Sequence, residues 1–184
     1  MSDTYGFDRE VKRYRDLLPR MLLDRPEVPI ADEDLMNIWN VMGLAGEIAS
    51  LILDSPHLKD EVADELGDAI WYVAALCEKL SFPFPKIVQL ADREPFLYSS
   101  KEPLALRLCI HAGKTVDIVK KGIFHRHGLD RDALELELIN CMTFILGLAV
   151  EYELRLTGIL KNNIKKLDAR YKSSFTSVES IGRS

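Results

Sequence analysis

The stretch that decides the fold is DELGDAIWYVAAL, residues 64–76. Its apolar residues recur at a helical spacing, which predicts a helix with a buried face. Glu65 and Asp68 are three residues apart, so both carboxylates lie on one side of that helix, one turn from each other. Two carboxylates at the start of a buried helix are unfavourable unless a positive charge lies between them. A hard divalent cation, Mg²⁺ or Mn²⁺, suits such oxygen ligands.

A further carboxylate lies upstream in GLAGEIASL, residues 43–51, where Glu47 is the single acidic group of an apolar, small-residue run. Three acidic groups on two adjacent helices can form one metal site, with Glu47, Glu65 and Asp68 as its ligands. The alternative is that Glu65 and Asp68 begin a solvated helix, where the helix dipole favours acidic residues.

The composition bounds the class of protein. A chain of 184 residues with 47% hydrophobic residues suits one globular domain, residues 1–184. A net charge of −5 argues against a nucleic-acid polymer as partner. No apolar run reaches the roughly 18–20 residues needed to span a membrane, and no signal-peptide pattern is present. The three cysteines are expected to be buried free thiols. We therefore expect a cytoplasmic protein without a membrane partner.

Helical patterns run along nearly the whole chain, and strand and hairpin signals are weak. The expected helices are residues 5–23, 33–53, 59–80, 86–92, 103–121, 130–153 and 156–171. Residues 172–184 form a polar, Ser-rich tail that we expect to be flexible. The pattern predicts an all-α helical bundle.

The two halves of the chain are similar to each other. Residues 65–73 align with 137–145, and residues 45–52 align with 112–119. This internal repeat, about 31–94 and 103–171, predicts two pseudo-symmetric helical hairpins in one chain. The alternative is that two amphipathic helix pairs are alike by composition only.

The motifs resemble a known family. GLAGE followed by DELGDAIWY is similar to the MazG-like all-α nucleoside triphosphate pyrophosphohydrolases, whose signature is Glu-x-x-Glu on one helix and Glu-x-x-Asp on the next. In the second half, KKGIFHRHGLDR at 120–131 resembles the inter-helix loop of that family, and NIKKLDARY at 163–171 resembles its closing helix. The resemblance covers most of residues 35–171.

The resemblance implies a helical bundle of the MazG-like type and metal-dependent hydrolysis of a nucleoside or deoxynucleoside triphosphate to the monophosphate and pyrophosphate. It implies that Glu47, Glu65 and Asp68 are the catalytic carboxylates that bind Mg²⁺, with Mn²⁺ as a substitute. It also implies a set of phosphate or sugar contacts: Lys121, Asn163, Lys166 and Arg170. A homodimer is possible, because members of the family commonly associate.

The chain departs from the family pattern in both halves. The second Glu of Glu-x-x-Glu falls on Ser50, and the aligned second-half positions of Glu47 and Asp68 are Lys114 and Asn140. In the first half, Ala91 and Glu94 stand where the family has its closing Asn and Lys. Because the losses are complementary, we expect one composite site, with the metal held by the first half and the phosphates by the second.

Two alternatives stay open. The loss of a carboxylate at Ser50 lowers cation affinity, so the protein can instead be a catalytically degenerate nucleotide-binding or structural, oligomerising relative. The basic residues also have simpler interpretations: Lys121 can favour a helix C-terminus, and Lys166 and Arg170 can belong to a solvated helix face.

Overall fold

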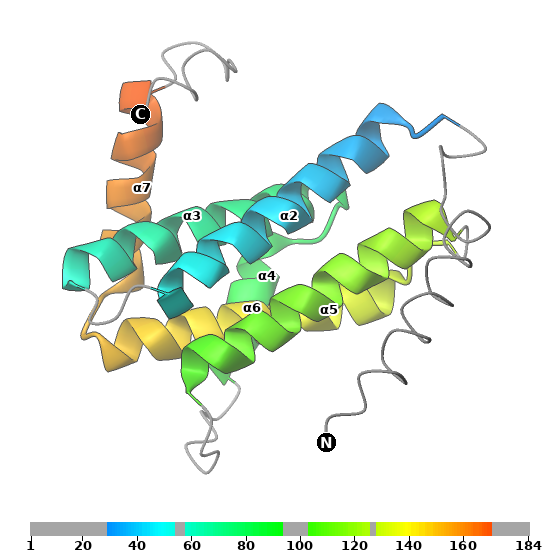
Figure 1. Cartoon of the computed structure of the whole chain (residues 1–184). Helices are drawn as coiled ribbons and strands as arrows, with labels where there is room; N and C mark the ends of the chain where they lie inside the picture. Colours follow the sequence, from blue (N-terminus) through cyan, green and yellow to red (C-terminus); the bar gives the residue numbers. More distant parts are fainter. Residues whose placement is uncertain (1–28, 54–57, 94–102, 126–127, 171–184) are drawn as a thin grey trace, which may run out of the picture. The chain divides into compact units, whose positions relative to one another are not determined.

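The computed structural model describes residues 29–53, 58–93, 103–125 and 128–170. These residues form six α-helices and contain no strand, which confirms the all-α prediction (Figure 1). The chain divides into one unit of residues 1–30 and another of residues 31–184, and the six helices belong to the second. The expected helix 5–23 and the expected tail 172–184 lie outside the described residues.

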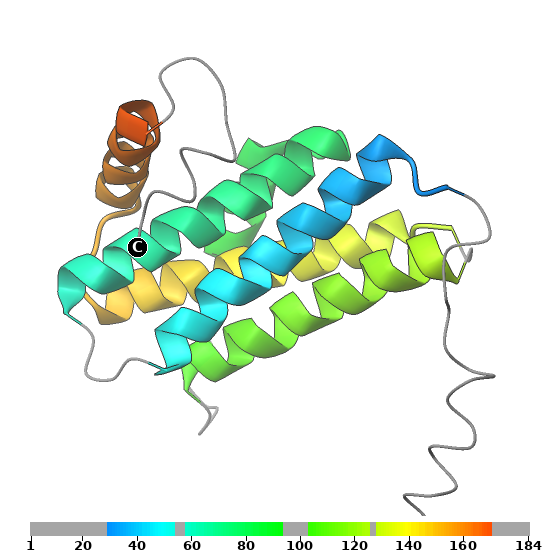
Figure 2. The same cartoon turned by 45° about the horizontal axis from the view of Figure 1, so that its top comes forward.

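The first helical hairpin consists of α2, Asp32–Leu53, and α3, Lys59–Lys79. Acidic residues occupy the first turn of each helix, where the dipole favours negative charge. At the start of α3, the Glu61 carboxylate accepts the backbone N–H of Leu58 at 3.2 Å, which satisfies one of the N–H groups that a helix start leaves open. The two helices run antiparallel and pack along each other (Figure 2).

The second hairpin consists of α5, Leu104–Phe124, and α6, Arg131–Glu151, also antiparallel. Asp130 caps α6, since its side chain accepts the N–H of Ala133 at 3.0 Å. The predicted end of α5 at residue 121 is three residues early, because the half-buried Ile123 continues to pack on the core. Helix α6 ends at Glu151 rather than at the predicted residue 153, where Glu153 has a left-handed φ of 52°.

Two shorter helices link the hairpins in a reciprocal way. Helix α4, Phe84–Arg93, follows α3 but packs mainly on α6, while α7, Leu156–Arg170, follows α6 but packs on α3. Helix α4 starts two residues before the predicted position, because Pro85 fits the first turn, where its missing N–H is not needed. A duplicated hairpin would produce this exchange, and the pseudo-symmetry itself stays a prediction.

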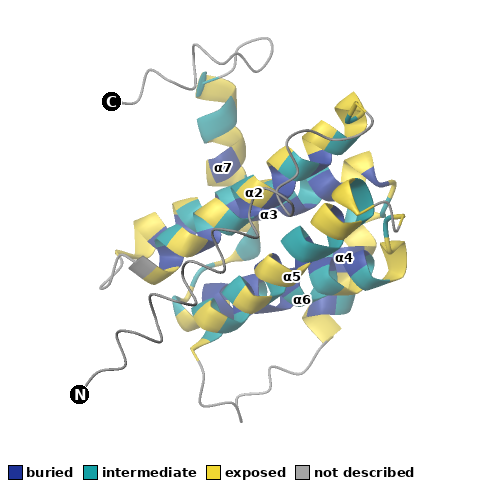
Figure 3. Ribbon diagram, turned by 45° about the vertical axis from the view of Figure 1, so that its right-hand side comes forward, coloured by how far each residue is buried: buried dark blue, intermediate teal, exposed yellow. Residues whose placement is uncertain are grey.

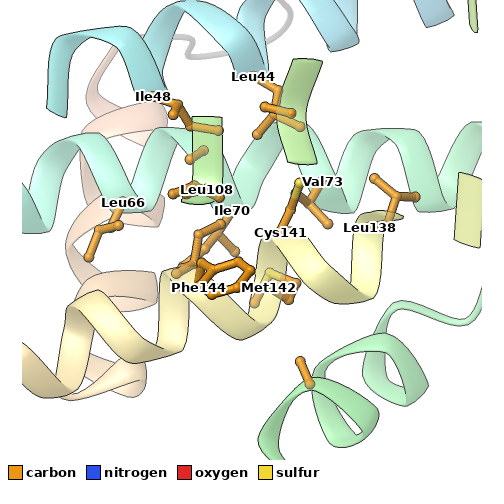
Figure 4. Packing of buried hydrophobic residues seen from close by; sticks show 14 of the residues in the cluster. Leu44, Ile48, Leu66, Ile70, Val73, Leu108, Leu138, Cys141, Met142 and Phe144 are labelled. Carbon is orange, nitrogen blue, oxygen red and sulfur yellow. The ribbon is translucent and has the colours of Figure 1, made fainter. Parts of the chain in front are cut away.

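The core lies between the four long helices, whose buried stripes face one another (Figure 3). Figure 4 shows side chains from all four helices in contact, among them Leu44, Ile70, Leu108 and Met142. Burial of apolar surface on this scale is the main source of stability.

All three cysteines are free, as expected. Cys77 and Cys141 are buried, and burial raises the pKa of each thiol to about 12, so both stay protonated at neutral pH. Cys109 is only partly buried, which corrects the expectation that all three would be buried.

By length and composition alone, two described helices are apolar enough to cross a membrane, Asp32–Ile52 within α2 and Arg131–Glu151 of α6. This differs from the expectation from uninterrupted apolar runs, because a window with a few scattered charges also passes the test. Of the apolar windows, 67% is buried inside the protein for α6 and 33% for α2. A core helix of a soluble protein meets the same criteria, and the cytoplasmic location stays a prediction.

Candidate functional site

The three predicted carboxylates lie in one neighbourhood of the first hairpin. The side chain of Glu47 on α2 is hydrogen-bonded to Glu65 on α3, and the charge of Asp68 also acts on it. Burial, the hydrogen bond with Glu65 and the two negative neighbours together raise the pKa of Glu47 to about 7, and the positive charge of Lys166 opposes that rise. Glu47 is therefore more readily protonated than an exposed glutamate, and burial is the main cause.

Close packing of α2 on α3 brings these carboxylates together. Gly43, one turn before Glu47, lies against the ring of Tyr72, one turn after Asp68, and the ring fills the space that a Cβ at residue 43 would need. The Trp71 ring meets the Tyr72 ring edge-on, with 4.9 Å between ring centroids. Gly43, the first residue of GLAGE, thus lets α2 approach α3 closely enough to place Glu47 beside α3.

Helix α7 joins this cluster through Asp68, and both carboxylate oxygens are engaged. Asn163 Nδ2 donates to Asp68 Oδ1 at 2.7 Å, and Lys166 Nζ donates to Asp68 Oδ2 at 2.7 Å. Lys166 Nζ also donates to Asp64 Oδ1 at 2.6 Å. Asn163 is buried and the Lys166 side chain is only 13% exposed, so these bonds lie in a partly desolvated place, where charged hydrogen bonds are strong.

A second glycine makes the α3–α7 contact possible. A Cβ added at Gly67 would lie 3.0 Å from the Cβ of Asn163, closer than side chains normally approach. Gly67 directly precedes Asp68, so the same close approach that needs a glycine sets the Asn163 amide on the Asp68 carboxylate. The glycine of the ELGD motif therefore has a packing role next to the candidate ligand.

The structure brings together five of the seven predicted site residues: Glu47, Glu65, Asp68, Asn163 and Lys166. Arg170 is the half-buried last residue of the same helix α7, one turn beyond Lys166. Lys121 is placed elsewhere, in the last turn of α5, where it pairs with Asp117 at 2.6 Å. Figures 1 and 2 draw that end of α5 at the opposite end of the bundle from α7.

Both oxygens of the Asp117 carboxylate pair with lysines of the same helix, α5. Hydrogen bonds from Lys120 and Lys121 lower its carboxyl pKa to about 2. Asp117 and Lys121 therefore form an ion-pair group on the surface of α5, which accounts for this basic residue without a phosphate.

Asp64 is the contact that the sequence analysis did not single out. It precedes Glu65 and lies four residues before Asp68, so the two aspartates share a face of α3. This spacing was a usable signal, but an exposed aspartate in the first turns of a helix has the same appearance as an ordinary solvated one. Its pairing with Lys166 depends on the docking of α7, which local sequence does not specify.

The aligned carboxylate of the second hairpin is neutralised by neighbours of its own. Glu137, which aligns with Glu65, shares a hydrogen bond of 2.6 Å with His111 Nδ1. The Glu137 carboxylate also lies 3.6 Å from Lys114 Nζ. Lys114 stands at the position aligned with Glu47. The His111 ring stacks on Phe144, with 5.2 Å between ring centroids. A side-chain cation thus accompanies this carboxylate, as Lys166 accompanies Asp68.

Whether a metal ion fits this cluster depends on how its ligands are arranged and on their chemical type. Within the described ranges, no three His, Cys, Asp or Glu side chains are arranged as a ready metal-binding group. The donor chemistry is nevertheless that of a hard cation site, since Glu47, Glu65 and Asp68 offer carboxylate oxygens. In the described arrangement Lys166 donates to Asp68, so the carboxylates are of the right chemical type for Mg²⁺ but are not arranged as a site for it.

Comparison with known proteins does not identify a family for this chain. No family model, no curated protein and no solved structure matched this chain. The resemblance to MazG-like pyrophosphohydrolases thus rests on the sequence motifs.

Proposed function

We propose that this protein hydrolyses a nucleoside or deoxynucleoside triphosphate to the monophosphate and pyrophosphate, at one composite site formed by α2, α3 and α7. One observation carries the proposal: Asp68 is bonded by Asn163 and Lys166, residues 95 and 98 positions away in the chain. Residues that the family resemblance assigns separately to metal and to phosphate thus meet on one carboxylate.

The chemistry follows from the side chains. Mg²⁺ held by Glu47, Glu65 and Asp68 would screen the phosphate charge and polarise the attacked phosphorus or its water. A carboxylate of this cluster that the ion does not fully use would orient or deprotonate the attacking water. Asn163 orients the Asp68 carboxylate, and Lys166 and Arg170 offer positive charge to the phosphates from α7.

The test is pyrophosphate release from a panel of canonical and damaged nucleoside triphosphates, with Mg²⁺, with Mn²⁺ and with EDTA. We expect metal-dependent release that Glu65→Gln abolishes, while Glu78→Gln, a matched change at an exposed position further along α3, leaves it unchanged. Equal release by both variants would exclude the carboxylate cluster as the site.

A second function is favoured by a specific observation. Both Asp68 oxygens are already bonded and Ser50 replaces the family's second Glu, which is what a nucleotide-binding protein without activity would show. In that case a nucleotide would raise Tm without pyrophosphate release, since a ligand that binds the native state stabilises it. An inert structural or oligomerising protein would show neither effect.

A further inference from the structure

The solvent-facing side of α2 is apolar along most of the helix. Between residues 35 and 52, its exposed positions carry no charged side chain: Leu35, Met36, Trp39, Met42, Gly46, Ala49 and Ile52. On α3, by contrast, every exposed residue except Trp71 is charged. Figure 2 shows α2 at the surface of the bundle, between α3 and α5. An exposed helix face of this composition is typical of a surface that another molecule covers.

The apolar area of this face is sufficient for a protein interface. Its five large side chains are between 42% and 64% exposed, and Met42 is the most exposed of them. At on the order of 100 Å² each, they present about 500 Å² of apolar surface per chain, which is large for a soluble monomer. Two such faces in contact bury about 1,000 Å², the size from which specific interfaces begin.

The spacing and the sizes of these residues indicate what the face packs against. Positions 35, 39, 42, 46 and 49 are separated by alternate steps of four and three residues, the spacing by which two helices pack side by side. Large side chains occupy the first half of this stripe and small residues the second half: Leu35, Trp39 and Met42, then Gly46 and Ala49. A second copy of α2, antiparallel to the first and related by a two-fold axis at position 44, would place Met42 opposite the partner's Gly46. The same axis would place Trp39 opposite the partner's Ala49.

The antiparallel direction is favoured by both volume and charge. In a parallel pair each Met42 would meet its own copy and each Gly46 would face the other, so large side chains would crowd and small residues would leave a void. A parallel pair would also bring together the two acidic first turns of α2, each with Asp32, Glu33 and Asp34. The antiparallel pair fills both halves of the stripe, because each contact occurs twice, and it keeps the acidic turns at opposite ends.

From this spacing, size pattern and charge, we propose that α2 is the interface of a homodimer, in which the stripe Leu35–Ala49 packs antiparallel on the same stripe of a second copy. Glu47 is bonded to Glu65 on α3 and not part of the stripe, so each chain keeps its own carboxylate cluster. The inference does not depend on the proposed hydrolysis, and its tests need neither nucleotide nor metal.

The first test is sedimentation velocity of the full-length chain over a range of micromolar concentrations. We expect a dimer, and we expect Met42→Glu to raise its Kd by at least about 100-fold, because the two-fold axis buries the new charge in two places. The matched control is Leu136→Glu on α6, where the leucine is 56% exposed; it should leave the Kd within about twofold. Circular dichroism establishes that each variant is folded. A dimer that Met42→Glu does not weaken would overturn the proposal.

A monomeric wild type would also overturn it, and two further measurements then identify the occupant. Sedimentation of the monomer with phosphatidylcholine vesicles would assign the stripe to a membrane surface. A lower Tm of monomeric Met42→Glu would assign it to another part of the same chain.

A second test concerns the direction of the pair. In Met42→Cys/Gly46→Cys the two new thiols of opposite chains lie level with each other, so mild oxidation should link the chains covalently. Met42→Cys alone should not do so, since the axis separates the two copies of position 42 by four residues, about 6 Å along the helices. Wild type measures any background from Cys77, Cys109 and Cys141. No linkage in the double variant, or equal linkage in Met42→Cys alone, would overturn the antiparallel dimer.

Discussion

Glu47 shows how a side chain acquires chemistry from its position. Burial, the hydrogen bond with Glu65 and the charges of Asp68 and Glu65 all favour its protonated form, and only Lys166 acts against them. A carboxyl group that titrates near neutral pH can accept a proton under physiological conditions, which an ordinary surface glutamate does poorly. The sequence predicts its presence in the cluster, whereas the pKa depends on the three-dimensional surroundings.

This shift has a consequence for stability in metal-free protein. Between about pH 4.5 and about pH 7, the native state keeps a proton on Glu47 that the unfolded chain has released. The free energy of unfolding therefore falls as the pH rises through this window and levels off above it. In Glu47→Gln this contribution is absent, so its urea unfolding curves should depend less on pH. Equal slopes for the two proteins would contradict the assignment of the shift to Glu47.

At the scale of the element, α7 is held to α3 by a small number of specific contacts. Asn163 and Lys166 bond to Asp68, and the absence of a side chain at Gly67 lets α7 approach. A helix docked by polar bonds and one close contact is sensitive to the volume of a single residue. The position of α7, and with it the phosphate side of the site, thus depends on Gly67.

Gly67→Ala should weaken this docking. The added Cβ meets Asn163, and relief of the overlap should cost about 1–3 kcal/mol and lower Tm. Gly113→Ala is the matched control on α5, because nothing lies within 4 Å of its added Cβ. That change should be neutral or stabilise by up to about 1 kcal/mol, since alanine favours a helix interior over glycine. Thermal unfolding compares the two, and equal stability changes would contradict the close packing at Gly67.

At the scale of the whole molecule, local sequence patterns predict where the helices lie in the chain better than they predict which helices pack together. Helical periodicity located all six described helices, and errors fell at ends such as Phe124, where tertiary packing extends the helix. The resemblance assigned Asp68, Asn163 and Lys166 to one composite site, and the structure brings the three into contact, while their roles stay predictions. The grouping of Glu47 with Glu65 and Asp68 likewise followed from two adjacent helices in sequence.

The remaining features depend on how helices far apart in the chain pack. Lys121 lies in a motif-like loop sequence, yet the direction of α5 takes it away from α7 and gives it Asp117 as a partner. Asp64 looks like a solvated aspartate until α7 supplies Lys166. Neither outcome can be read from local spacing, because both follow from the reciprocal exchange in which α7 packs on α3 and α4 on α6.

The central claim is that Asp68 joins metal and phosphate functions in one hydrolytic site, and Asp68→Asn tests it most directly. The measurement is pyrophosphate release with Mg²⁺ across the nucleotide panel, for wild type, Asp68→Asn and the exposed control Asp92→Asn on α4. Removal of one carboxylate charge should reduce release by at least about 100-fold while the protein stays folded, because that charge is needed for the ion. Asp92→Asn should behave like wild type. Full activity in folded Asp68→Asn, or no release from wild type with any nucleotide, would contradict the account.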